Sequence, residues 1–321
     1  MPHLGHAGCI TVGHQWSSHL YWMHLEAPAY SPHTVPAVDD SFRRTLEESK
    51  GNSMTEGVES GIDERDVDVR GTRIHLMASG TGPPLLYLHG AGDLGAWPDG
   101  LTALARRFSV YRPDHPGFNA SGDNSSIDSV HDLAFFYLDL LDVLGLDSVI
   151  LIGASFGGWL AADIASLDPS RVDKLVLVDA AGVRAETPTP DVFALSPVEV
   201  AEHAYHTAAA RTAAIGQAAQ IEQDPSLFER YLRNRMSTAN VGWNPYMHDP
   251  KLLDRLHRII APTLIVWGAE DRLLPVAYAW RWAGLLPTAR VEILEGTGHL
   301  PLVEQPAAFL DVVDDFLGSV R

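Results

Sequence analysis

Short runs of apolar residues recur along the chain and predict buried strands. An alternating pattern over 67–70 and 73–77 predicts a hairpin of two strands, and 129–144 has the apolar spacing of a helix. The remaining predicted strands lie at 85–88, 108–111, 149–152, 174–179, 263–267 and 291–294, and we expect helices over 276–285 and 306–317. Strands that are apolar throughout and alternate with helices predict an α/β fold, with a mostly parallel sheet flanked by helices on both faces.

The alternation stops between Gly182 and about Arg258, where the pattern is helical throughout. Helix starts are indicated at Ser196-Pro197, where Glu199 completes a capping box, and at Asp224-Pro225 and Asp249-Pro250. We therefore expect a helical cap, or lid, over 183–258. It is inserted after the sixth strand and divides the core into 61–182 and 259–321. Such an insertion would cover the carboxyl edge of the sheet, where the active sites of α/β proteins lie.

Composition limits the partners that the chain can have. A net charge of −18 argues against nucleic acid and anionic membranes, so we expect a small-molecule substrate, and the oligomeric state stays open. A single cysteine, Cys9, allows no intrachain disulfide and indicates a reducing, cytoplasmic location. Residues 1–60 lack core periodicity and are expected to be a disordered extension. Met54 is typical of a natural start, which would leave residues 1–53 upstream of it.

The segment Gly153-Ala154-Ser155-Phe156-Gly157 carries the clearest chemistry. It is a G-x-S-x-G motif directly after the apolar strand 149–152 and before a helical segment, which is the context in which this motif forms a nucleophile elbow. The turn is so tight that it needs glycine on both sides of the serine. It holds the serine in a strained conformation at a helix N-terminus. We predict that Ser155 is the nucleophile.

A serine hydroxyl needs a general base and a carboxylate that orients this base. His299 is the candidate base, in the Gly-rich loop between the last strand and the last helix, and Asp271 is the candidate acid, after the preceding strand. Asp179, at the end of the sixth strand, is the alternative acid. The chain order Ser155, Asp271, His299 is the one expected for an α/β-hydrolase layout.

The oxyanion of such a reaction needs two backbone donors. We expect them to be the amides of Phe156 and of Ala91, which belongs to the loop His89-Gly90-Ala91-Gly92. Glycine at position 90 would allow close approach of the substrate. Trp97 and Trp267 are candidates for the wall of the substrate pocket, whereas His89 and Asp114 are expected to order their loops. No spacing of ligands predicts a metal site or a cofactor.

Together these motifs resemble the α/β-hydrolase family in its capped branch, from about Asp66 to the C-terminus. The loop Asp114–Gly122 resembles the family's D-x-P-G-x-G-x-S segment, with Asn119-Ala120 where a glycine is usual. Trp267-Gly268-x-x-Asp271-Arg272 is similar to enzymes that hydrolyse meta-cleavage products. The resemblance implies a cap arginine for the substrate carboxylate, here Arg235 or Arg233. The chain departs from that subfamily at Leu300-Pro301-Leu302, where an aromatic residue is expected after the histidine.

Three hypotheses about function follow. The first is a cofactor-independent serine hydrolase that cleaves a small, fairly apolar carbonyl substrate, most simply a carboxylic ester, through an acyl-enzyme. The second is carbon–carbon bond hydrolysis of a meta-cleavage-type diketo acid. The third belongs to another class: a ligand receptor of the same fold with very slow turnover. Rapid turnover of activated esters would separate an enzyme from a receptor.

Overall fold

The computed structural model describes residues 61–318, so the expectations for 1–60 and for the last three residues lie outside the described residues. An eight-stranded sheet has the order β1-β2-β4-β3-β5-β6-β7-β8, in which β2 runs antiparallel to β1 and β4 and the other pairs are parallel. The strands are β1 (Asp63–Val69), β2 (Thr72–Ser79), β3 (Pro84–Leu88), β4 (Ser109–Pro113), β5 (Val149–Ala154), β6 (Val172–Val178), β7 (Thr263–Gly268) and β8 (Ala289–Leu294). The mostly parallel sheet predicted from the sequence is confirmed.

Helices cover both faces of this sheet. One buried apolar cluster joins the sheet to α3 (Val130–Val143), α4 (Phe156–Leu167) and α8 (Ala277–Ala283). A second joins it to α2 (Asp99–Leu104), the short α9 (Pro301–Glu304) and α10 (Pro306–Gly318). Strand β1 begins four residues before the predicted position, because the charged residues 63–66 continue the pairing with β2 at the edge of the sheet, without an apolar pattern.

Three α-helices follow β6 in the segment expected to be a cap: α5 (Pro197–Ala204), α6 (Ala208–Gln223) and α7 (Pro225–Gly242). The capping box is present, since Ser196 Oγ accepts from Glu199 N and Glu199 Oε2 accepts from Ser196 N. The predicted third helix is wrong. Asp249-Pro250 leads into two 3₁₀ turns, Leu252–Asp254 and Leu256–Arg258, because the backbone around Asp249 bonds to Gly182 instead.

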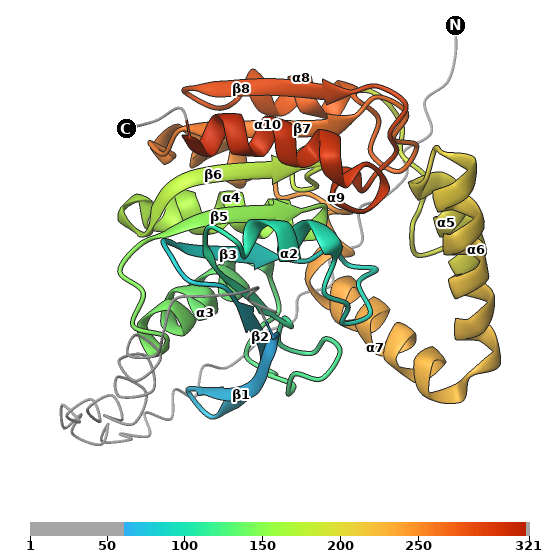
Figure 1. Cartoon of the computed structure of the whole chain (residues 1–321), viewed down its shortest axis with the longest axis horizontal. Helices are drawn as coiled ribbons and strands as arrows, with labels where there is room; N and C mark the ends of the chain where they lie inside the picture. Colours follow the sequence, from blue (N-terminus) through green and yellow to red (C-terminus); the bar gives the residue numbers. More distant parts are fainter. Residues whose placement is uncertain (1–60, 319–321) are drawn as a thin grey trace, which may run out of the picture. The chain divides into compact units, whose positions relative to one another are not determined.

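The strands β3, β5 and β6 point their carboxyl ends towards the side on which α5, α6 and α7 lie (Figure 1). The loops that leave these strands therefore meet the three helices at one edge of the sheet. This edge is where a ligand site is expected in an open α/β sheet. Within residues 61–318, no helix is both long and apolar enough to cross a membrane.

Candidate active site

Ser155 lies in the turn between β5 and α4, with φ of 54° and ψ of −116°. Positive φ is uncommon for a residue with a side chain, so this conformation is strained, as predicted. The flanking glycines are required by space. A Cβ on Gly153 would lie 2.2 Å from Gly157 O, and one on Gly157 would lie 2.1 Å from Leu88 O. The tight elbow therefore depends on both glycines, and it raises Ser155 at the N-terminus of α4.

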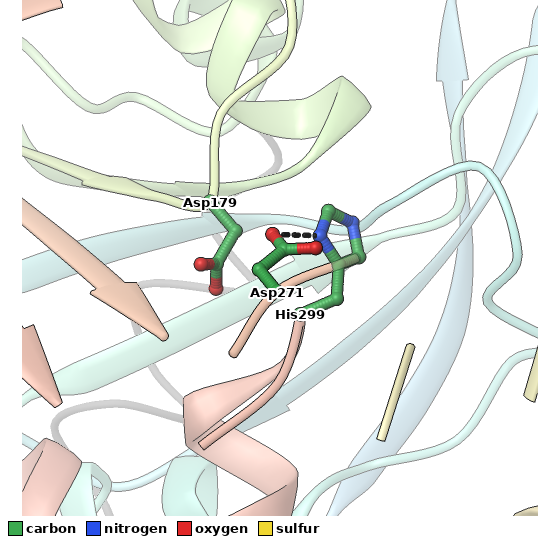
Figure 2. A group of neighbouring side chains, drawn as sticks. All are labelled: Asp179, Asp271 and His299. Atoms are coloured by element: carbon green, nitrogen blue, oxygen red, sulfur yellow. Dashed lines mark hydrogen bonds and ion pairs between the residues drawn. The ribbon is translucent and has the colours of Figure 1, made fainter. Parts of the chain in front are cut away.

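Asp271 and His299 contact each other directly, although 28 residues separate them (Figure 2). His299 Nδ1 lies 2.7 Å from Asp271 Oδ2, and both side chains are buried. The other carboxylate oxygen, Oδ1, accepts from the amides of Leu273 at 2.8 Å and Leu274 at 2.9 Å. In the neutral tautomer that donates Nδ1–H to this carboxylate, Nε2 carries a free lone pair and can act as a base.

A second carboxylate lies on the far side of Asp271 (Figure 2). Asp179, directly after β6, is completely buried; its Oδ1 accepts from Gly268 N at 2.9 Å, and its Oδ2 has no hydrogen-bond partner. Burial and then the charge of Asp271 hold the pKa of Asp179 well above its ordinary value. Both effects favour the protonated form of Asp179 beside the Asp271–His299 pair.

Ligand atoms of Asp179, Asp271 and His299 all lie within 4.8 Å of one another, so by distance alone they could hold a cation. The two atoms best placed for this, His299 Nδ1 and Asp271 Oδ2, instead share a proton at 2.7 Å. A cation would have to displace that proton. The donor set therefore fits a base and its orienting acid better than a metal centre.

Ser155, Asp179, Asp271 and His299 follow β5, β6, β7 and β8, which are four consecutive strands of the sheet. The fold thereby brings the predicted residues to one edge. Within residues 61–318, no hydrogen bond joins Ser155 Oγ to His299. This contact is often long in a site without substrate and tightens only when substrate binds.

The loop after β3 approaches the nucleophile. A Cβ on Gly90 would lie 3.3 Å from Ser155 Cβ and 3.9 Å from Ser155 Oγ, so glycine keeps the space beside the hydroxyl open. Phe156 is the first residue of α4, and the first amides of a helix have no acceptor within it. Ala91, the next residue of the Gly90 loop, is half-buried.

Buried polar residues fix this loop from below. His89 and His115 stack with ring centroids 3.8 Å apart, and the backbone amide of His115 donates to His89 Nε2 at 3.1 Å. Burial, followed by the charge of Arg112, lowers the pKa of His89 to about 4. His89 is therefore neutral and already bonded, so it orders the loop, as predicted. Asp114 likewise bonds within its turn, to Arg112 at 2.8 Å and Asn119 at 3.0 Å.

The predicted pocket residues differ in outcome. Trp267 is completely buried in the core beside α8, and its indole donates to Leu274 O at 2.8 Å. The prediction that it contacts substrate is wrong, because its side chain lies in the core between β7 and the helices that cover this face of the sheet. Trp97 is half-buried, packs against the second core cluster and donates to Thr102 Oγ1 at 3.0 Å.

The two cap arginines both contact protein. Arg235 donates to Leu195 O at 3.1 Å and to the Tyr231 hydroxyl. Arg233 donates at 2.7 Å to the carbonyls of Asn119 and Ser121. Both guanidinium groups are therefore bonded to oxygens of the protein itself.

Sequence reasoning assigned no role to three residues that shape this site. Glu304 and Arg272 connect the catalytic loops to α5 and α6, and Asn234 of α7 bonds the loops at Asp93 and Asn119. A hollow of about 810 Å³ beside Asp271 is lined in part by Arg272, His206 and Thr207. A larger one, of about 1500 Å³, lies beside α8 and includes no member of the predicted triad. Only the position of Arg272 next to Asp271 offered a signal in the sequence.

The chain belongs to the α/β-hydrolase fold family, whose model matches residues 83–306. It is 32% identical over 280 residues to an uncharacterized protein of Mycobacterium tuberculosis, an alignment that covers 79% of this chain and 80% of the relative. It is 27% identical to the 2-hydroxy-6-oxo-6-phenylhexa-2,4-dienoate hydrolase of Burkholderia cepacia, over 77% of this chain and 92% of that enzyme.

Solved structures agree with this assignment. A membrane phospholipase A, described as a bacterial virulence factor, superposes with a TM-score of 0.62 at 26% identity, covering 87% of this chain and 90% of that one. The 2-hydroxy-6-oxo-6-phenylhexa-2,4-dienoate hydrolase of Rhodococcus sp. strain RHA1 has a TM-score of 0.69 at 20% identity, covering 81% and 99%. The protein is an α/β-fold serine hydrolase.

Proposed function

We propose that the protein hydrolyses a small, fairly apolar carboxylic ester through an acyl-enzyme on Ser155. The observation that carries this proposal is the buried 2.7 Å contact between Asp271 and His299, at the sheet edge that also bears Ser155 in a strained elbow. Nucleophilic catalysis by serine requires a base that a carboxylate orients and a serine at the same edge of the sheet. We propose the catalytic roles of all three residues on this ground.

The reaction proceeds in two halves. His299 Nε2 takes the proton of Ser155 Oγ as the oxygen attacks the substrate carbonyl, and the new oxyanion accepts hydrogen bonds from the amides of Ala91 and Phe156. The carbon–oxygen bond then breaks, and the leaving alcohol takes the proton from His299. Water, deprotonated by His299, attacks the acyl-enzyme in the same way and releases the acid and free Ser155. Asp271 orients His299 and stabilises the imidazolium in both halves.

A second candidate is hydrolysis of a carbon–carbon bond. The names of several relatives support it, including the Burkholderia cepacia enzyme and a 2-hydroxy-6-oxo-2,4-heptadienoate hydrolase of Pseudomonas putida at 28% identity. Such substrates carry a carboxylate, which needs a cation. Arg233 and Arg235, the cations that the resemblance implies for this role, already contact protein carbonyls, and either one would have to leave these partners to bind a carboxylate. Ester hydrolysis has no such requirement.

The proposal is tested with a fluorophosphonate probe and a panel of substrates. We expect the probe to form an adduct on the peptide that contains Ser155, and the Ser155→Ala variant to form none. Initial rates on p-nitrophenyl esters of increasing acyl length and on a 2-hydroxy-6-oxo-dienoate then separate the two substrate classes. An adduct elsewhere, or none in the folded protein, would overturn the assignment of Ser155. One turnover without recycling would favour a receptor.

A further inference from the structure

The end of α5 lies directly against the loop that bears His299. The backbone amide of His299 donates to Ala204 O, the last residue of α5, at 2.6 Å. A Cβ on Gly298 would lie 2.2 Å from the same oxygen, so the approach is closer than any other residue at position 298 would allow. The backbone amide of His299 thus donates its hydrogen bond to the segment that we expect to be the cap.

Glu304 makes a second connection at the same place. Its Oε2 accepts from the amide of Gly298 at 2.7 Å, while its Oε1 accepts from the amide of His206 at 2.9 Å and from that of Thr207. Thr207 is the N-cap of α6. One carboxylate therefore joins the residue before the base to the junction between α5 and α6. Hydrogen bonds to a charged acceptor are stronger than neutral ones, which makes this a firm connection.

Arg272 makes a third connection, next to the acid instead of the base. This residue follows Asp271 directly, and its guanidinium donates to Glu202 O in the last turn of α5. Carbonyls in the last turn of a helix lack partners within the helix and attract cations. We name the contacts of Arg272, Gly298, His299 and Glu304 with residues 202–207 the cap anchor.

We propose that Glu304 and Arg272 are positioning residues which fix the end of α5 on the two catalytic loops, so that the position of the cap sets the position of His299. This inference rests on the proposed function of the triad and adds how the triad is assembled. Within residues 61–318, neither side chain has a hydrogen bond to Ser155 or to the imidazole ring. Both act through the backbone of residues 298 and 299 and through the loop at Asp271.

The consequence is a coupling between the cap and the chemistry. Any movement of α5 or α6 must either break the bond between His299 N and Ala204 O or shift the histidine with it. A displacement of about 1 Å in a catalytic group can lower a rate on the order of 100-fold. A substrate that displaces the cap would therefore shift His299. Ser155 would then be activated only while the end of α5 keeps its bonds to the loop of His299.

The test compares Glu304→Ala, Glu304→Gln and Arg272→Ala with wild type. We expect kcat on an activated ester, and the rate at which a fluorophosphonate labels Ser155, to fall about 10- to 100-fold in Glu304→Ala, with KM changed less than about threefold, because the placement of the base is disturbed while no proposed substrate contact is removed. Both rates should fall less in Glu304→Gln, since the amide oxygen of glutamine still accepts hydrogen bonds from one of the two sides. Arg272→Ala should also lower both rates.

Asn240→Ala serves as the matched control. Asn240 lies on α7, and its side chain donates to Ile127 O at 2.9 Å, which is a contact between cap and core far from both catalytic loops. We expect wild-type kcat for this variant. Hydrogen exchange of the peptide around 298–304 supplies an independent measurement: exchange should become faster in Glu304→Ala and stay unchanged in Asn240→Ala.

The outcomes are distinguishable. No labelling of Ser155 in wild type would refute the proposed function itself. Labelled wild type together with folded Glu304→Ala and Arg272→Ala variants of unchanged kcat would overturn the inference alone, as would a change confined to KM. If Glu304→Ala fails to fold, Glu304→Gln and the exposed Arg272→Ala decide the question. A double variant should lose no more than the worse single variant if both residues act through the end of α5.

Discussion

At the scale of single residues, two aspartates near one histidine have different states. Asp271 bonds to His299 and to two amides, whereas Asp179 has one amide partner and an Oδ2 with none. Burial and the charge of Asp271 favour the protonated form of Asp179. Asp271, which bonds the imidazole directly, is therefore the better candidate for the charge that orients the base.

This difference predicts unequal effects of two similar substitutions. In Asp271→Asn we expect the amide oxygen to keep its bonds from Leu273 and Leu274, so that the NH2 group faces Nδ1 and the imidazole takes the wrong tautomer. We expect kcat to fall on the order of 10²–10⁴, near the loss seen for the comparable change in serine proteases. Asp179→Asn replaces a neutral acid by a neutral amide of similar shape and should cost less than about tenfold. Both are measured as kcat on the best ester. A larger loss for Asp179→Asn would make Asp179 the orienting acid.

The same proton on Asp179 predicts how stability depends on pH. The pKa of Asp179 in the folded protein is raised from an ordinary 3.8, so the folded state binds this proton more tightly than the unfolded state does. Its stabilising contribution is complete below the unfolded value and is lost as pH rises towards the folded value. We expect the melting temperature of Asp179→Asn to increase relative to that of wild type as the pH rises from 5 to 8. Parallel melting temperatures in a pH series would contradict this.

The residues of the proposed triad were predictable because their signals are local. Gly153, Ser155 and Gly157 specify an elbow when they lie between a strand and a helix, and Asp271 and His299 were found because each follows an apolar strand. The local sequence around Trp267 did not show which side of β7 this residue occupies. Its aromatic side chain suited a pocket wall, but in the structure it packs against the helices that cover the sheet.

At the scale of elements, the predicted helix starts within 183–258 differ in whether their backbone bonds are local or long-range. The starts of α5 and α7 were predicted because Ser196 and Asp224 accept from amides within their own first turns. The third predicted start, Asp249-Pro250, failed because long-range backbone bonds to Gly182 compete with the helix. The capping residue Asp249 therefore starts no α-helix, because the adjoining backbone is paired with Gly182.

The start and the end of α5 should have separate roles. Ser196→Ala removes the oxygen that accepts from Glu199 N, and loss of such a cap costs about 0.5–2 kcal/mol. We expect a melting temperature lower by a few degrees with kcat unchanged, because the cap anchor lies at the other end of the helix. Calorimetry and ester kinetics on the same sample check both parts. A large fall in kcat would show that all of α5 positions His299.

At the scale of the whole described molecule, two of the places where α5–α7 contact the core lie beside the loops of the site. One is the cap anchor at the catalytic loops. The other is on α7, where buried Asn234 accepts from Asn119 N at 2.9 Å and donates to Asp93 O at 2.7 Å. Sequence alone predicted an insertion after the sixth strand but neither contact, since the bonded residues are 70 to 141 positions apart. Only the folded chain brings them together.

Asn234 provides a final prediction about this second contact. Asn234→Ala leaves the Asn119 amide and the Asp93 carbonyl without their partner in a buried place, and each unsatisfied group costs about 1–3 kcal/mol. Asn240→Ala, which loses one exposed bond, should cost less than about 0.5 kcal/mol. Because Asp93 follows the loop of Gly90 and Ala91, release of its carbonyl should also slow labelling of Ser155 through the oxyanion donors. Denaturant unfolding and probe kinetics measure the two effects. Equal stability of the two variants would show that α7 is held to the core by other contacts, and labelling at the wild-type rate would show that the oxyanion loop keeps its position without α7.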